Sequence, residues 1–154
     1  MTADHGEEHG ERGEFTHAHS VNPAVLRVPL LIRYPSSVPA GQRIGATVSL
    51  RSVPATVLEL AGLPVPPTMA AGLGRYWLDS TTPGEPAVSS LFYEGDSSFS
   101  VILGAIQYQV VKGVERLVPV AAETDVVNLV RDPRHAAAVA RGRDLLDSLL
   151  GVAP

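Results

Sequence analysis

The chain has 154 residues, of which 45% are hydrophobic, and its formal net charge is −4. This composition predicts one domain with a packed core, and the acidic balance argues against a nucleic-acid or anionic-membrane partner, because both need a basic face. The absence of cysteine excludes disulfides, thiolate metal sites and a cysteine nucleophile within the chain. No apolar run reaches the ~18 residues of a membrane span, and the N-terminus has no signal-peptide pattern. Localisation is left open.

Titratable side chains are concentrated in residues 2–19. This stretch holds four of the five histidines and five carboxylates, namely His5, His9, His17, His19, Asp4, Glu7, Glu8, Glu11 and Glu14. No apolar periodicity accompanies them, so the pattern predicts a loop that glycines allow to fold back on itself. The side chains can then converge, and a metal is one candidate for what they converge on. Glu7 and Glu8 either orient His5 through hydrogen bonds or form a solvated face, and the solvated face is the preferred interpretation.

The next part of the chain predicts one strand and one helix. Leu30, Leu31 and Ile32 form a continuous apolar run, which is typical of a strand buried on both faces of an α/β sheet. Residues 52–62 indicate a helix, with Ser52 as its cap and Gly62 at its end. Residues 63–86 are rich in proline, glycine and threonine and predict mostly loop, in which Trp77 serves as a packing anchor.

From residue 87 the pattern changes to short strands separated by turns. Residues 88–93, 100–103, 105–111 and 116–120 predict an antiparallel meander. A helix follows over residues 132–150, with Asp132 as its N-cap and Pro133 in its first turn. Its packing face is expected to consist of Val139, Leu146, Leu149 and Leu150.

Four stretches of the chain resemble, in the right order, the C-terminal part of a sulfatase-like hydrolase of the alkaline phosphatase superfamily. They are TADHGE at residues 2–7, LRVPLLI at 26–32, VSLRSVPATVLELAGLP at 48–64 and NLVRDP at 128–133. The resemblance implies an α/β fold, namely the C-terminal portion of an alkaline-phosphatase-like sheet with a small antiparallel β subdomain and a C-terminal helix. It implies a division into residues 1–86, from the α/β domain, and residues 87–154, the antiparallel subdomain with its helix.

The resemblance also implies the site residues. Asp4 and His5 match the family's metal-binding pair, and the metal is a divalent ion (calcium, manganese or zinc). His17 and His19 are the candidates for the catalytic histidine that contacts the oxygens of the ester. The family's glycines beside that histidine are replaced here by Thr16 and Ala18, and its aromatic–acidic pair before RVPL is replaced by residues 22–23.

By resemblance, the chain is expected to be part of a metal-dependent hydrolase of sulfate or phosphate esters. The family's nucleophile motif is absent from this sequence, so its partner is expected to be a missing N-terminal part of the same enzyme, and the chain alone is expected to be inactive. Whether it is an enzyme by itself is left open. The alternatives are a non-catalytic metal- or partner-binding domain derived from that fold, and a histidine-rich metal-storage tail on an unrelated domain.

Overall fold

The computed structural model describes residues 1–79, 81–121 and 127–150, with the side chains of residues 149 and 150 left aside. The chain forms two compact units, of which one combines Met1–Leu30 with Ala87–Pro154 and the other is Leu31–Pro86. The division into domains after residue 86 stays a prediction.

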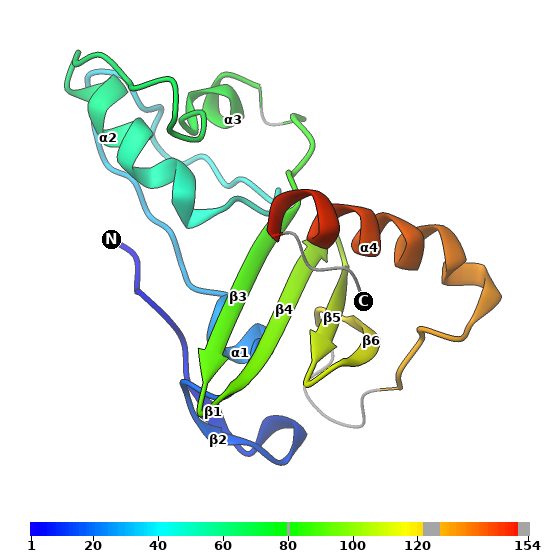
Figure 1. Cartoon of the computed structure of the whole chain (residues 1–154). Coiled ribbons are helices and arrows are strands. Elements are labelled where there is room, and N and C mark those ends of the chain that lie inside the picture. The colour runs from blue at the N-terminus through cyan, green and yellow to red at the C-terminus, as the bar shows by residue number, and fades with distance from the viewer. Residues whose placement is uncertain (80, 122–126, 151–154) are drawn as a thin grey trace. The chain divides into compact units, whose positions relative to one another are not determined.

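A four-stranded antiparallel sheet forms the centre of the first unit (Figure 1). Its strands are β3 (Ala87–Tyr93), β4 (Asp96–Leu103), β5 (Ile106–Val111) and β6 (Val114–Pro119), and each pairs with the next along the chain. This order is the meander predicted from the alternation of strand and turn signals. Because side chains alternate between the two faces of a strand, the sheet presents two surfaces of different composition.

One surface of the sheet is apolar and is covered by helix α4 (Ala136–Leu150). The core between them consists of Phe99, Val101, Tyr108, Val110 and Leu117 from the sheet and of Val139 and Leu146 from the helix. The predicted packing roles of Val139 and Leu146 are therefore confirmed, whereas Leu149 and Leu150 lie outside the described side chains. Asp132 caps the 3₁₀ turn η3 (Pro133–His135) before the helix by accepting a hydrogen bond from the backbone N–H of Arg134 at 2.9 Å.

A polar contact fixes α4 at one end of this core. The hydroxyl of the buried Tyr108 donates a hydrogen bond to Glu115, whose carboxylate also accepts two bonds from Arg143 at 2.6 and 2.7 Å. The Arg143 hydrogen bonds lower the pKa of Glu115 to about 2, and burial raises the pKa of Tyr108 to about 12. A Cβ atom on Gly142 would lie 2.5 Å from the Tyr108 ring, so only glycine permits this approach of helix and sheet.

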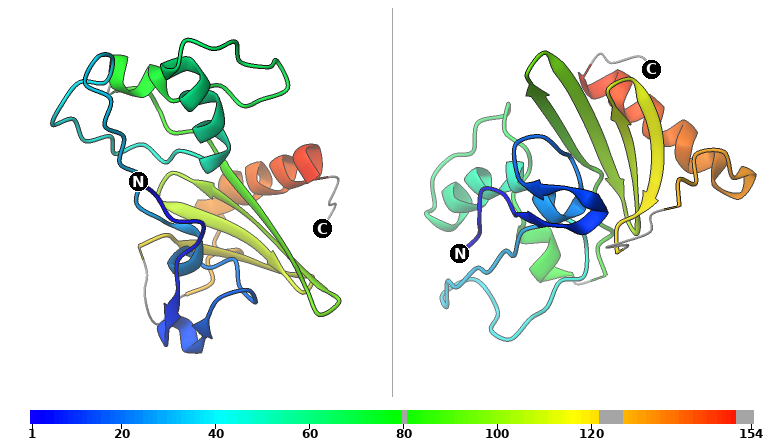
Figure 2. Two further views of the ribbon diagram at one scale, coloured as in Figure 1. Left: turned by 90° about the vertical axis from the view of Figure 1, so that its left-hand side faces the viewer. Right: turned by 90° about the horizontal axis from the view of Figure 1, so that it is seen from below.

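The opposite surface of the sheet carries the N-terminal segment (Figure 2) and combines buried polar side chains with the buried Ile102 and Val118. The buried side chain of Gln107 donates to the carbonyl of Val21 at 2.7 Å and to the hydroxyl of Ser100 at 3.1 Å. The buried Gln109 donates to the same carbonyl at 3.2 Å and to the side-chain oxygen of Gln107 at 2.9 Å. The segment is thus held on the sheet by directional hydrogen bonds.

The second unit, Leu31–Pro86, contains α2 (Val53–Leu60), which confirms the helix predicted over residues 52–62. Ser49 rather than Ser52 provides the cap, since its hydroxyl accepts from the N–H of Arg51 in the preceding turn η2 (Leu50–Ser52). The buried Thr56 accepts a hydrogen bond from the N–H of Leu73 at 2.9 Å. Trp77 is only 9% exposed, as expected of an anchor, although it lies in a short helix, α3 (Gly74–Leu78), that the sequence pattern did not indicate.

The buried strand expected at residues 30–32 does not form. Residues 27–34 form no strand, and the side chain of Leu31 is 55% exposed. The apolar run indicates a preference for a strand, but a strand also needs a neighbouring strand to satisfy its backbone groups. Within the described residues, the strands pair with one another in two antiparallel sheets.

Candidate functional site

The histidine-rich stretch folds into a loop whose two ends are joined. Strand β1 (Glu8–His9) pairs with β2 (Phe15–Thr16), the 3₁₀ turn η1 (Glu11–Gly13) lies between them, and α1 (Pro23–Leu26) follows. The N–H of Gly6 donates to the carbonyl of Val25 at 2.7 Å. A Cβ atom at Gly6 would lie 2.0 Å from the carbonyl oxygen of Ala24, so this closure of the loop requires glycine.

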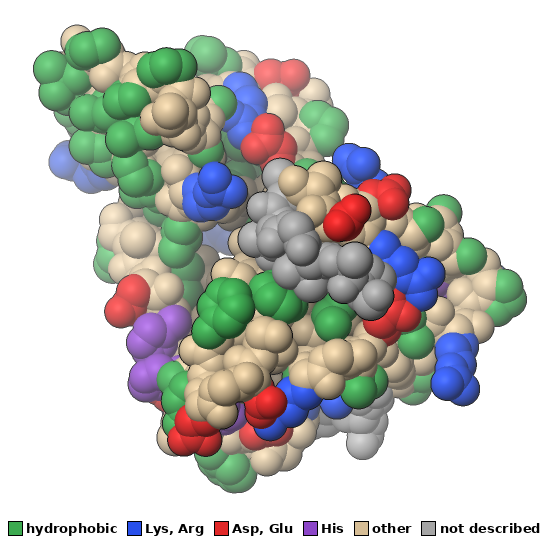
Figure 3. All heavy atoms as spheres, viewed as in Figure 1, with side chains coloured by type: hydrophobic (Ala, Val, Ile, Leu, Met, Phe, Trp, Pro, Cys, Tyr) green, Lys and Arg blue, Asp and Glu red, His purple; other side chains and the backbone are tan. Residues whose placement is uncertain are grey.

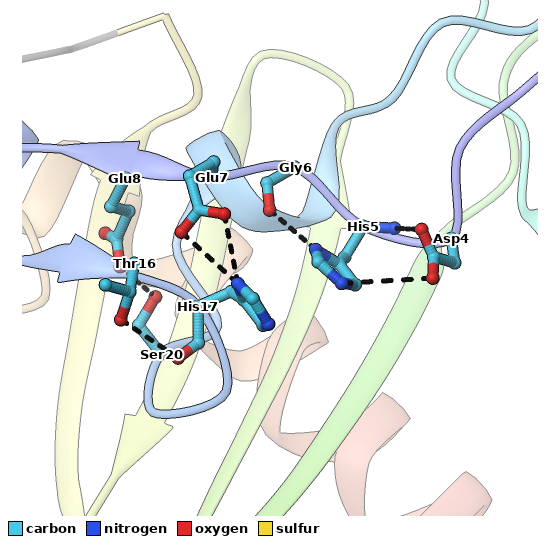
Figure 4. A network of polar contacts seen from close by, with 8 residues as sticks. All are labelled: Asp4, His5, Gly6, Glu7, Glu8, Thr16, His17 and Ser20. Carbon is cyan, nitrogen blue, oxygen red and sulfur yellow. Dashed lines mark hydrogen bonds and ion pairs between the residues drawn. The ribbon is translucent and has the colours of Figure 1, made fainter.

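Asp4 and His5 lie at the beginning of this loop with their side chains on the same side (Figure 4). The backbone N–H of His5 donates to the carboxylate of Asp4 at 3.0 Å and holds the pKa of Asp4 below its ordinary value. The Nδ1 atom of His5 lies 2.8 Å from the carbonyl oxygen of Gly6, which fixes the tautomer with the proton on Nδ1. In the neutral imidazole this tautomer leaves a lone pair on Nε2, which lies 3.9 Å from an oxygen of Asp4.

His17 is brought next to His5 from the other end of the loop. The two imidazole rings are stacked with their centroids 4.1 Å apart. Nδ1 of His17 lies 3.1 and 3.2 Å from the two carboxylate oxygens of Glu7. A carboxylate on Nδ1 orients the ring and leaves Nε2 for another partner, and histidine side chains reach the molecular surface (Figure 3). His19 instead has its Nε2 atom 3.5 Å from the carboxylate of Glu14.

The backbone around His17 is strained. Thr16 and Ala18, which stand where the resemblance implies glycine, have φ values of 69° and 73°. This left-handed region costs a non-glycine residue roughly 1–2 kcal/mol, and β-branched residues rarely occupy it. The loop thus keeps the conformation that glycine would adopt without strain. The surrounding contacts must compensate for the difference.

Asp4 and His5 fit a divalent metal in their chemistry, since a carboxylate oxygen and an imidazole nitrogen are both common ligands of manganese and zinc. They are two donors only. Within residues 1–79, 81–121 and 127–150, no group of three or more histidine, aspartate or glutamate side chains lies close enough to hold a metal. A metal at this pair would therefore need further ligands from water, substrate or another polypeptide.

Glu8 is the residue that sequence reasoning missed. It was expected on a solvated face, but its side chain is 1% exposed and accepts hydrogen bonds from Ser20 and Asn22, both at 2.8 Å. The exposed Glu7 contacts His17, because neighbouring residues of an extended chain point to opposite sides. The one sequence signal for a buried polar contact here was Asn22, a polar residue at a position where the resemblance implies a different residue type.

Comparison with solved structures places this arrangement in a known fold. A candidate sulfatase from Bacteroides thetaiotaomicron superimposes with a TM-score of 0.78 at 22% identity, covering 97% of this chain and 35% of that one. A protein in complex with its substrate D-glucosamine-2-N,6-O-disulfate gives a TM-score of 0.74 at 17% identity, with 97% and 33% covered. A 2-O GAG sulfatase gives 0.78 at 22% identity, with 97% and 35% covered.

The chain therefore has the fold of the C-terminal part of these sulfatases, as the sequence resemblance predicted. It spans about a third of the length of the structures that it matches. No family model matches the sequence, and no curated protein sequence matches it. Among the described residues, no helix is long and apolar enough to cross a membrane.

Proposed function

We propose that this chain is the C-terminal portion of a metal-dependent, sulfatase-like hydrolase that acts on sulfate or phosphate esters. The observation that carries the proposal is the likeness to sulfatase structures over 97% of the chain. The pairing of Asp4 with His5 at the start of the loop adds to it. Two of the similar proteins are described with a sulfated sugar or as a GAG sulfatase, so a sulfate ester is the first substrate to test.

In this function each described side chain has a defined task. Asp4 and the Nε2 atom of His5 would hold the metal, which supplies Lewis-acid polarisation of the sulfuryl or phosphoryl group when bound. His17, oriented by Glu7 through Nδ1, would present Nε2 to the ester, and as an imidazolium it would donate a hydrogen bond to the ester oxygens or a proton to the leaving oxygen. His19 is the second candidate for this contact, at the expense of its approach to Glu14.

The nucleophile and further metal ligands would come from the remaining two-thirds of the fold, which is the proposed partner of this chain. In such a hydrolase, a nucleophilic side chain or a water molecule attacks sulfur or phosphorus. This chain would contribute the metal pair and the histidine that contacts the ester oxygens. A domain that binds metal without catalysis would use the same pair, so the experiment must measure metal binding and turnover separately.

Titration of the purified chain with Mn²⁺ tests the metal pair. We expect one site whose affinity falls at least tenfold in the Asp4→Ala and His5→Ala variants, because each removes one of few ligands. His9→Ala is the matched control, since His9 lies in the same loop and outside the proposed pair. Several weak and equivalent sites would instead support a metal-storage segment, and unchanged binding in Asp4→Ala would refute the assignment.

Turnover is measured on the same samples with an aryl sulfate and an aryl phosphate. The chain alone is expected to hydrolyse neither, because its sequence lacks the nucleophile motif. Metal-dependent turnover that Asp4→Ala abolishes would show that the nucleophile lies within this chain and would contradict the proposal. Turnover that appears only after addition of the remaining part of the enzyme would support it.

A further inference from the structure

A second group of polar side chains lies beneath the histidine loop around one buried carboxylate, that of Glu8. Glu8 is 1% exposed, and its two carboxylate oxygens accept hydrogen bonds from the hydroxyl of Ser20 and from the amide nitrogen of Asn22. The backbone N–H of Asn22 also donates to the hydroxyl of Ser20 at 3.3 Å. A buried carboxylate is costly unless it is hydrogen-bonded, so this arrangement holds its partners in one geometry.

The group continues to the sheet. Arg12 donates to the side-chain oxygen of Asn22 at 3.0 Å, and Gln109 approaches the same oxygen at 3.4 Å. Burial lowers the pKa of Arg12, while the nearby Glu8 acts in the opposite direction and Arg116 adds to the lowering. Glu8 thus provides the negative charge that allows a guanidinium to remain half-buried under the loop.

These contacts join the two sides of the loop. Glu8 belongs to β1, whereas Ser20 and Asn22 follow the segment that carries His17 and His19. These contacts lie on either side of residues 9–19 and so close the loop at its base. Within this segment, Thr16 and Ala18 occupy the left-handed region. A strained conformation persists only where surrounding contacts over-determine it, and the carboxylate of Glu8 is the central acceptor of those contacts.

We propose that Glu8 is a positioning residue for His17 and His19, acting through Ser20 and Asn22. The inference rests on the proposed function for the task of His17 and His19, whereas the contacts of Glu8 are a property of this chain alone. Removing the carboxylate leaves two partly buried donors without their acceptor, and the loop then loses the conformation in which His17 stacks on His5. The predicted consequence is a displaced pair of imidazoles in a chain whose sheet and α4 remain folded.

The test exchanges the roles of the two partners. In Glu8→Gln, the new side-chain NH₂ group faces the NH₂ group of Asn22, so that two donors oppose each other. In Asn22→Asp, two carboxylates face each other. In the double variant Glu8→Gln/Asn22→Asp, the side-chain NH₂ group of residue 8 donates to the new carboxylate, and its side-chain oxygen accepts from Ser20. The second oxygen of the new carboxylate remains as the acceptor for Arg12. The net charge of the double variant equals that of the original chain, so restored behaviour reports hydrogen-bond pairing and not charge.

Two measurements on the full chain follow the histidines and the loop. Long-range ¹H–¹⁵N spectra of the imidazoles, recorded at fixed pH well below the unfolding temperature, report the surroundings of His17 and His19. Amide exchange over residues 9–21 is expected to rise about tenfold in either single variant, since each leaves a buried donor or acceptor unpaired. Glu11→Gln, a change of an exposed carboxylate in the same loop, is the control.

The proposal predicts shifted imidazole signals in both single variants and their return in the double variant. Imidazole signals that stay unchanged while the unfolding temperature falls would show a merely structural role and overturn it. Shifts that persist in the double variant would also overturn it. Neither measurement uses metal or ester, so the failure of Mn²⁺ binding at Asp4 and His5 would refute the proposed function without altering this result.

Discussion

The two faces of the sheet use the same strands for opposite kinds of contact. Under α4 the buried residues are largely apolar, and Val101 and Leu117 are completely buried. On the other face, buried polar residues such as Ser100, Gln107 and Gln109 lie among buried apolar residues. Helix α4 is thus attached mainly by apolar packing, with one polar contact through Arg143, whereas hydrogen bonds from Gln107 and Gln109 to the carbonyl of Val21 hold the segment that follows the histidine loop.

This difference separates stability from positioning. Apolar burial is non-directional and roughly proportional to area, so it stabilises the unit without selecting one exact arrangement. Hydrogen bonds depend steeply on distance and angle, so they select an arrangement while adding only about 1 kcal/mol each to stability. The polar face is therefore suited to hold a loop whose imidazoles must point in fixed directions, and the apolar face is suited to keep the sheet intact.

The largest effect is expected from Leu117→Ala on the apolar face. Leu117 is fully buried against α4, and its truncation leaves a cavity, which costs about 2–5 kcal/mol. Urea unfolding followed by circular dichroism measures this loss. Exchange of the loop amides in the native state should rise only as much as the fall in global stability requires.

Gln107→Leu is the matched change on the polar face. It keeps the approximate volume but removes the donor to Val21 and Ser100, so we expect a smaller loss, about 1–3 kcal/mol. Loop exchange should rise beyond the global effect, in contrast to Leu117→Ala. Equal behaviour of the two variants in both measurements would remove the distinction between the faces.

Much of the first unit could be predicted from sequence because its strands pair with their neighbours along the chain. The meander, Asp132 as a cap and the packing of Val139 and Leu146 all follow from local patterns. The strand at residues 30–32 could not be predicted in the same way. Its apolar run states a preference, but pairing depends on which other strands are present, and that is not a local property.

The candidate site shows the same limit. The resemblance implied Asp4 and His5 as a metal pair and His17 or His19 as the contact to the ester, and the structure brings His17 onto His5. The tautomers, the contact with Glu7 and the burial of Glu8 depend on how residues 8 and 22 meet, fourteen positions apart. No spacing rule for a two-residue strand distinguishes an inward carboxylate from an outward one, so Glu7 and Glu8 looked equivalent.

An intermediate effect is expected at the polar contact that fixes α4. The pKa of Glu115 lies at about 2 in the folded chain and at 4.5 ordinarily, so its ionised form favours the folded state. This contribution is fully present above pH 4.5 and is lost as the pH falls towards 2. Glu115→Gln should therefore be less stable than the original chain at pH 6, and the gap should narrow between pH 4.5 and 2.

Urea unfolding at pH 6, 4 and 3 measures this gap. The control is Asp144→Asn, which changes an exposed carboxylate on α4 and should show a smaller difference from the original chain at pH 6. A gap between Glu115→Gln and the original chain that is constant from pH 6 to 3 would show that the salt bridge to Arg143 contributes nothing through its charge.

The smallest effect concerns the strain beside His17, and it has the opposite sign. Ala18 has a φ of 73°, so Ala18→Gly relieves roughly 1–2 kcal/mol of strain in the folded state, while the greater freedom of glycine in the unfolded chain opposes this by about 0.4–1 kcal/mol. We expect a net gain between zero and about 1 kcal/mol in thermal unfolding. Ala140→Gly, in the exposed part of α4, should instead lose about 1 kcal/mol.

The same substitution also probes the link between strain and the buried carboxylate. If the contacts of Glu8 hold Ala18 in the left-handed region, the loop relaxes in Glu8→Gln and the strain disappears with it. Ala18→Gly should then bring no gain in that background, which a double-mutant cycle measures directly. A gain of equal size in both backgrounds would show that the conformation of Ala18 is set by the hairpin of β1 and β2 alone, and that the polar face merely receives a loop already shaped.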